Sequence, residues 1–125
     1  MEDFFEQLRL RILEKSEIQG GPGGCFVWKG ATTAHGYGVL RVRWPEEGPK
    51  FERVHRAILM AQMRLTRSQF PGGNLEVSHL CHKKLCVNAT HLVLETHEVN
   101  QERNHCKAQG FCCRAHHPHC ILPCN

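Results

Sequence analysis

The chain has 125 residues, of which 41% are hydrophobic and 22% are charged, a balance typical of one folded domain and not of a disordered chain. The net charge of +4, together with ten histidines that titrate near neutral pH, mildly favours a polyanionic partner such as nucleic acid. No apolar stretch is long enough to cross a bilayer, so no membrane partner is expected.

The first 18 residues predict an amphipathic helix. Phe5, Leu8 and Ile12 recur at helical spacing, and the helix is expected to end near Ser16, before the flexible segment QGGPGG at 19–24. Charges interrupt every apolar run here, so no signal peptide is recognisable. We therefore expect an intracellular protein, in the nucleus or the cytoplasm, whose eight cysteines bind metal rather than form disulfides.

Residues 25–125 are expected to complete a single compact α+β domain. Between 25 and 54, short runs rich in Val, Phe, Trp and Tyr alternate with glycines, which predicts an antiparallel hairpin or meander with one apolar and one basic face. Residues 55–64 predict a buried helix, and PGGN at 71–74 predicts a loop. Thr96 is a plausible N-cap for a further short helix, and the tail beyond Cys106 requires something other than secondary structure to hold it.

The stretch SHLCHKKLCVNATHL at 78–92 has the ligand types and the spacing of a structural zinc site. Four residues separate Cys81 from Cys86, and four more separate Cys86 from His91, so one loop offers three ligands. Cys25 is the only cysteine upstream and would complete a Cys3His set, although it could instead be a buried free thiol.

The tail offers more than enough ligands for a second zinc ion. We favour Cys106, Cys113, His116 and Cys120, and keep Cys112, His117 and Cys124 as possible substitutes. A tail of unligated thiols is the alternative.

His79 remains outside both ligand sets. Ligation of Cys81 would hold the backbone beside it rigidly, which suits a general base. Asn100 lies on the predicted helix with Arg103 and Asn104 on the same face, and its carbonyl oxygen suits Mg2+. Such a set favours phosphodiester hydrolysis, although each residue alone could be structural or merely solvated.

From Cys25 to Cys106, the sequence resembles the His-Me finger (ββα-metal) nucleases, in particular the His-Cys box homing endonucleases and related phage-type HNH proteins. The matching segments are WKG at 28–30, GYG at 36–38, VHR at 54–56, SHLCH at 78–82 and CVNATHL at 86–92. The resemblance implies a β-hairpin with His79 as base, a zinc loop, and a helix with Asn100 holding the catalytic ion. It also implies an arginine on the preceding sheet that contacts the scissile phosphate, for which Arg41 and Arg43 are the candidates.

The sequence departs from the family pattern in three places. Asn88 and Ala89 stand where relatives usually have NP, and the gap from Cys113 to His116 is one residue longer. The arm through which the homing endonucleases exchange segments in a dimer is missing, so a homodimer is possible but not implied.

DNA is the expected partner, with phosphate contacts from Arg41, Arg43, Lys50, Arg53, Lys83 and Lys84. These cations could equally be solubilising charges. The sequence thus predicts a zinc-stabilised, Mg2+-dependent DNA endonuclease, with a non-catalytic zinc module that binds nucleic acid or protein as the alternative. A metal-storage or redox thiol protein is a third possibility.

Overall fold

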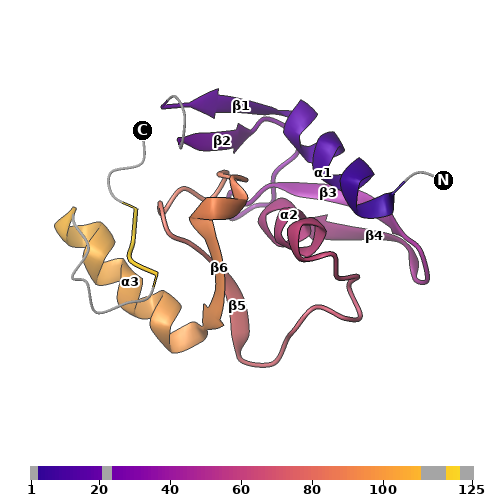
Figure 1. The fold of residues 1–125 in the computed structure, drawn as a ribbon. Helices are drawn as coiled ribbons and strands as arrows, with labels where there is room; N and C mark the ends of the chain where they lie inside the picture. Colours follow the sequence, from indigo (N-terminus) through magenta and orange to yellow (C-terminus); the bar gives the residue numbers. More distant parts are fainter. Residues whose placement is uncertain (1–2, 21–23, 111–117, 122–125) are drawn as a thin grey trace.

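The computed structural model describes residues 3–20, 24–110 and 118–121. Along the chain, a helix and two short strands precede a long hairpin, a second helix, and then a strand, a loop, a strand and a third helix. The described strands form three separate two-stranded antiparallel sheets rather than one larger sheet. Figure 1 shows the third helix at one side of the molecule and the first two helices at the other. The predicted α+β class is confirmed.

Helix α1 (Phe4–Glu14) begins at an N-cap. The side chain of Asp3 accepts a hydrogen bond of 3.0 Å from the backbone N–H of Phe5. The helix ends two residues earlier than expected, because β1 (Ser16–Gln19) pairs antiparallel with β2 (Cys25–Trp28). Ile18 is the only residue of β1 with a marked strand preference, so its pairing with β2 across the glycine-rich segment is what makes it a strand.

The hairpin of β3 (Val39–Trp44) and β4 (Gly48–Arg53) has the two faces that the sequence predicted. Its inner face buries Leu40, Val42 and Trp44 in the core, whereas Arg41 and Arg43 are exposed. Helix α2 (Val54–Met63) follows β4 directly and is buried along most of its length, which confirms the predicted buried helix.

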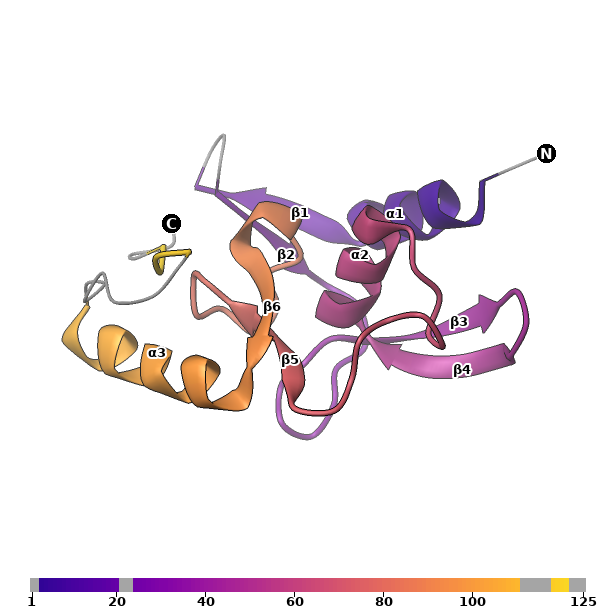
Figure 2. The ribbon, with the colours of Figure 1, turned by 60° about the horizontal axis from the view of Figure 1, so that its bottom comes forward.

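The last part of the described chain has the order strand, loop, strand, helix. Strand β5 (Leu75–His79) pairs antiparallel with β6 (Leu92–Thr96), and the loop between them contains the 3-10 helix η1 (Ala89–His91). Helix α3 (His97–Gln109) follows β6 and is capped by Thr96, as predicted. In both views this strand pair lies between α3 and α2 (Figures 1 and 2). None of the helices among the described residues has the length and hydrophobicity that a bilayer-spanning helix needs.

Candidate metal centre and active site

Four buried ligand atoms converge where β2 meets the loop between β5 and β6. They belong to Cys25, Cys81, Cys86 and His91, and all lie within 4.8 Å of one another. The Sγ atoms of Cys25 and Cys81 are 3.5 Å apart, and Nδ1 of His91 lies 3.7 Å from Sγ of Cys25 and 3.5 Å from Sγ of Cys86. The structure therefore brings together the three ligands that the spacing predicted and Cys25, which was expected to complete the set.

The three separations given above fit tetrahedral zinc. With zinc–sulfur bonds of about 2.3 Å and zinc–nitrogen bonds of about 2.0–2.1 Å, ligand atoms around one ion lie roughly 3.5–3.8 Å apart. The hydrogen bond between Cys81 and Cys86 lowers the pKa of Cys86 to about 6 and raises the pKa of Cys81. Three cysteines and one histidine, all buried and at these separations, suit a structural zinc site in which every coordination position is filled by the protein.

Backbone hydrogen bonds attach the loop that carries Cys86 to strand β2. The N–H of Trp28 donates to the carbonyl of Leu85 at 2.8 Å, and the N–H of Val87 donates to the carbonyl of Phe26 at 2.7 Å. Cys25 on β2 is thereby held across from Cys86, although 60 residues of chain separate them.

Asn88 caps the 3-10 helix that carries His91. Its Oδ1 accepts hydrogen bonds from the backbone N–H and the hydroxyl of Thr90, at 3.0 and 2.8 Å. Its Nδ2 donates to the carbonyl of Gly24 at 2.8 Å, next to Cys25. A buried asparagine therefore connects both halves of the ligand set, and Ala89 begins the 3-10 helix without a proline.

Of the second predicted zinc set, Cys113 and His116 lie outside the described residues. Cys106 on α3 and Cys120 are both buried, and the guanidinium of Arg103 donates to Sγ of Cys120 at 3.3 Å. The N–H of Ile121 donates to the carbonyl of Leu80 at 2.8 Å, so this part of the tail lies against the loop between β5 and β6 that carries Cys81.

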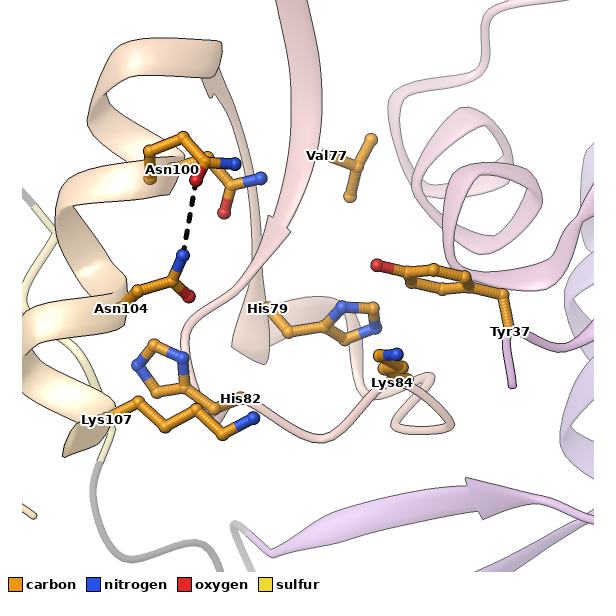
Figure 3. Close-up of a pocket in the computed structure, with 9 residues that line it drawn as sticks. Tyr37, Val77, His79, His82, Lys84, Asn100, Asn104 and Lys107 are labelled. Carbon is orange, nitrogen blue, oxygen red and sulfur yellow. Dashed lines mark hydrogen bonds between the residues drawn. The ribbon is translucent and has the colours of Figure 1, made fainter. Parts of the chain in front are cut away.

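His79, at the end of β5, lines a cavity of about 210 Å³ between β5, α3 and the loop that carries Tyr37 (Figure 3). Its Nε2 atom has no hydrogen-bond partner within the described chain. Burial is the main cause that lowers the pKa of His79 to about 4, while a hydrogen bond with the backbone of Cys86 opposes the shift. The imidazole is therefore neutral near pH 7, the state in which it can accept a proton.

His79 belongs to a row of three mutually tilted rings that sequence reasoning missed. The ring of His55 on α2 lies 4.9 Å from the ring of His79 and 5.3 Å from the ring of Tyr37. The motif VHR marked His55 as a feature of the family but not as a neighbour of His79, because their approach depends on how α2 packs against β5. Burial lowers the pKa of His55 to about 3.

Asn100, on the first turns of α3, lines the same cavity as His79. Its Nδ2 donates a hydrogen bond of 2.5 Å to Oε1 of Glu76, whose carboxylate also lies 3.2 Å from Nδ1 of His97. This hydrogen bond lowers the pKa of Glu76 and leaves Oδ1 of Asn100 for another partner. The carbonyl of Asn100 and the carboxylate of Glu76 are oxygen ligands of the type that Mg2+ prefers.

Of the two residues expected on the same helix face as Asn100, Asn104 lines the cavity and Arg103 does not. The side chain of Arg103 is fully buried and pairs with Glu95 on β6 at 2.6 and 2.8 Å. The ion pair with Glu95 holds the side chain of Arg103 in the interior, and it connects α3 to β6.

Two lysines line the cavity. Lys84 comes from the loop between β5 and β6, residues 80–91, which we call the zinc loop, and Lys107 comes from α3. Arg41 and Arg43 do not line it, because both lie exposed on the outer face of β3. Arg53 lies closer to the cavity, since its guanidinium carbon is 5.0 Å from the ring centroid of Tyr37. Nζ of Lys84 lies 5.1 Å from the same centroid.

Residues 24–125 match the family model described as the zinc-binding loop region of homing endonuclease. The chain belongs to this family. It is also 32% identical over 105 residues to Protein 2.8 of Escherichia phage T7, across 79% of this chain and 65% of that protein, so it spans slightly less than two thirds of that relative. No solved structure gives a significant match. Membership of this family and the Cys3His cluster together support zinc as a metal of this protein.

Proposed function

We propose that this protein is a magnesium-dependent DNA endonuclease. The observation that carries the proposal is the shared cavity: His79, neutral near pH 7, and Asn100 line the same space, next to the Cys3His cluster. In the proposed reaction His79 accepts a proton from the attacking water. When bound at Asn100, Mg2+ would stabilise negative charge on the phosphate and on the leaving 3′ oxygen.

The other residues of the cavity would position the strand. Lys84 and Lys107 line the cavity, and in this proposal they would contact the phosphate under attack. Arg41, Arg43, Lys50 and Arg53 on the hairpin, together with Lys83, would bind flanking phosphates. The zinc cluster would hold the backbone beside Cys81, and through it the ring of His79.

Cleavage of supercoiled plasmid DNA tests this proposal. Wild type with Mg2+ should convert the plasmid to nicked or linear form, and His79→Ala should lose about 10²–10⁴-fold in rate with its zinc content unchanged. Asn100→Ala should lose cleavage in the same way. His35→Ala, which removes an exposed histidine, is the matched control. A wild type that binds DNA but never cuts it would instead make this a non-catalytic zinc module.

We also propose a second structural zinc on Cys106, Cys113, His116 and Cys120. The burial of Cys106 and Cys120 supports it. Elemental analysis should give two zinc ions per chain, and one ion would remove the tail site. Zinc that is bound loosely, and whose removal leaves the fold intact, would point instead to a metal-storage or redox thiol protein.

A further inference from the structure

The outer face of the β3–β4 hairpin carries an exposed aromatic ring among arginines. Phe51 is 70% exposed and lies directly across the ladder from Arg41. In the same register Arg43 pairs with Pro49, and Val39 pairs with Arg53. Because residues paired across an antiparallel ladder point to the same face, this surface combines three arginines with one phenylalanine and has no carboxylate.

Phe51 also lines a groove. The groove has a volume of about 450 Å³, and its other lining residues are Thr33, Val39, Glu52, Arg53, Arg56 and Arg67. Its size lies within the roughly 300–1,000 Å³ range of small-ligand sites. Glu52 is almost fully buried and holds Arg56 at 3.2 Å and Arg67 at 3.3 Å, so the guanidinium groups are fixed in place. Arg67 also lies 3.9 Å from Glu47, so Arg53, Arg56 and Arg67 face two carboxylates and leave the groove positive.

We propose that this groove binds an unpaired nucleotide of a DNA strand, with the base stacked on Phe51 and the phosphates beside Arg41 and Arg53. The inference rests on the proposed function, since it names the form of DNA that the same nuclease takes. A duplex presents phosphates and base edges, and its base faces are covered by stacking. An exposed phenylalanine has no group that hydrogen-bonds to a base edge, but its ring face can stack on an unpaired base.

The position of Arg53 connects the groove to the catalytic cavity. Arg53 lines the groove and stacks on Tyr37, while Tyr37 lines the cavity of His79. A strand whose unpaired nucleotide sits on Phe51 can therefore continue past Arg53 towards His79. The expected substrate is DNA with unpaired nucleotides beside the cleavage position, rather than uninterrupted duplex.

The test is a binding titration without added divalent ion, so that no strand is cut. The probes are a fluorescein-labelled oligo(dT), a duplex of equal length, and the same duplex with a bulge of unpaired thymidines. Phe51→Ala should weaken binding to oligo(dT) and to the bulged duplex by about tenfold or more, and change binding to the plain duplex by less than about twofold. Phe51→Trp should retain the affinity of the wild type.

Ile18→Ala is the matched control, because Ile18 is 69% exposed but lies on β1. Equal losses on all three probes, or no loss on any, would overturn the inference. So would a wild-type dimer that Phe51→Ala converts to a monomer, because Phe51 would then be a protein contact. If the wild type never cuts DNA, yet Phe51→Ala weakens binding only to the probes with unpaired nucleotides, the proposed function fails and the binding surface stands. If wild type cuts and Phe51→Ala binds all probes normally, only this inference fails.

Discussion

The orientation of a single carboxamide decides whether Asn100 can serve a metal ion. Glu76 has a lowered pKa and is ionised at neutral pH, so it can only accept hydrogen bonds, and Nδ2 of Asn100 must face it. Oδ1 then remains for a cation. Glu76 is thus a positioning residue for Asn100. The sequence did not predict this role, because the contact joins strand β5 to helix α3.

Replacing Glu76 by glutamine should weaken the hold on that orientation, since an amide can both donate and accept. We expect Glu76→Gln to raise the Mg2+ concentration for half-maximal cleavage by about three- to tenfold, with the rate at saturating Mg2+ largely retained. A change of this size corresponds to the loss of a charge-assisted hydrogen bond at a partly exposed site. Glu98→Gln removes an exposed acid from the same helix and is the control. An unchanged Mg2+ requirement would remove Glu76 from this role.

His55 makes the stability of the fold depend on pH. Its pKa is lowered to about 3 in the folded protein, mainly by burial and further by His79, Arg53 and Arg56. The unfolded chain therefore binds a proton below about pH 6.5 that the folded chain does not, and the free energy of unfolding falls as the pH falls.

We expect the replacement His55→Phe, which keeps an aromatic ring next to His79, to make this dependence shallower. Between about pH 6 and 4 the difference in slope should approach roughly 1.4 kcal/mol per pH unit, measured by urea unfolding of both proteins. Proton binding by the zinc ligands is common to both proteins and cancels in the comparison. His35→Gln, at an exposed histidine, should leave the slope unchanged, and parallel curves for His55→Phe and wild type would contradict the argument.

At the scale of elements, the zinc loop shows what spacing can and cannot predict. The ligand types and gaps of Cys81, Cys86 and His91 identified the set, because one loop must supply three ligands at close range. Spacing did not show that Asn88 connects this loop to Gly24, nor that Arg103 turns towards Glu95. The first contact joins residues that are far apart in the chain, and the second depends on how α3 packs against the preceding strand β6, so neither ligand spacing nor helix periodicity predicts them.

The connection through Asn88 can be tested alone. Asn88→Ala removes the cap of η1 and the bond to Gly24 while keeping all four ligands, and it leaves buried polar groups without partners. We expect a loss of about 1–3 kcal/mol in the free energy of unfolding of the zinc-loaded protein, measured by denaturant titration, and faster transfer of zinc to a chelator. Asn74→Ala, at an exposed position, should change neither quantity. Normal zinc retention in Asn88→Ala would show that the ligands alone hold the loop.

At the scale of the whole molecule, cations lie on two separate surfaces. Arg41 and Arg43 lie on the outer face of the hairpin, whereas Lys83 and Lys84 lie on the zinc loop, and Figure 2 shows the hairpin and α3 at opposite ends of the molecule. Among the described residues no carboxylate pairs with Arg41 or Arg43. Bound DNA would therefore extend from the hairpin across the cavity of His79 to the zinc loop.

The dependence of DNA affinity on salt tests whether both surfaces contact phosphates at once. Each lost phosphate contact should reduce the slope of log affinity against log salt by about 0.9 on duplex DNA. We expect the double variants Arg41→Ala with Arg43→Ala, and Lys83→Ala with Lys84→Ala, each to reduce the slope by up to about 1.8, and all four changes together to sum. Arg11→Ala with Lys15→Ala removes two exposed cations at the end of α1 and should leave the slope unchanged. If only one pair lowers the slope, the strand passes over that surface alone, and the path across the cavity is wrong.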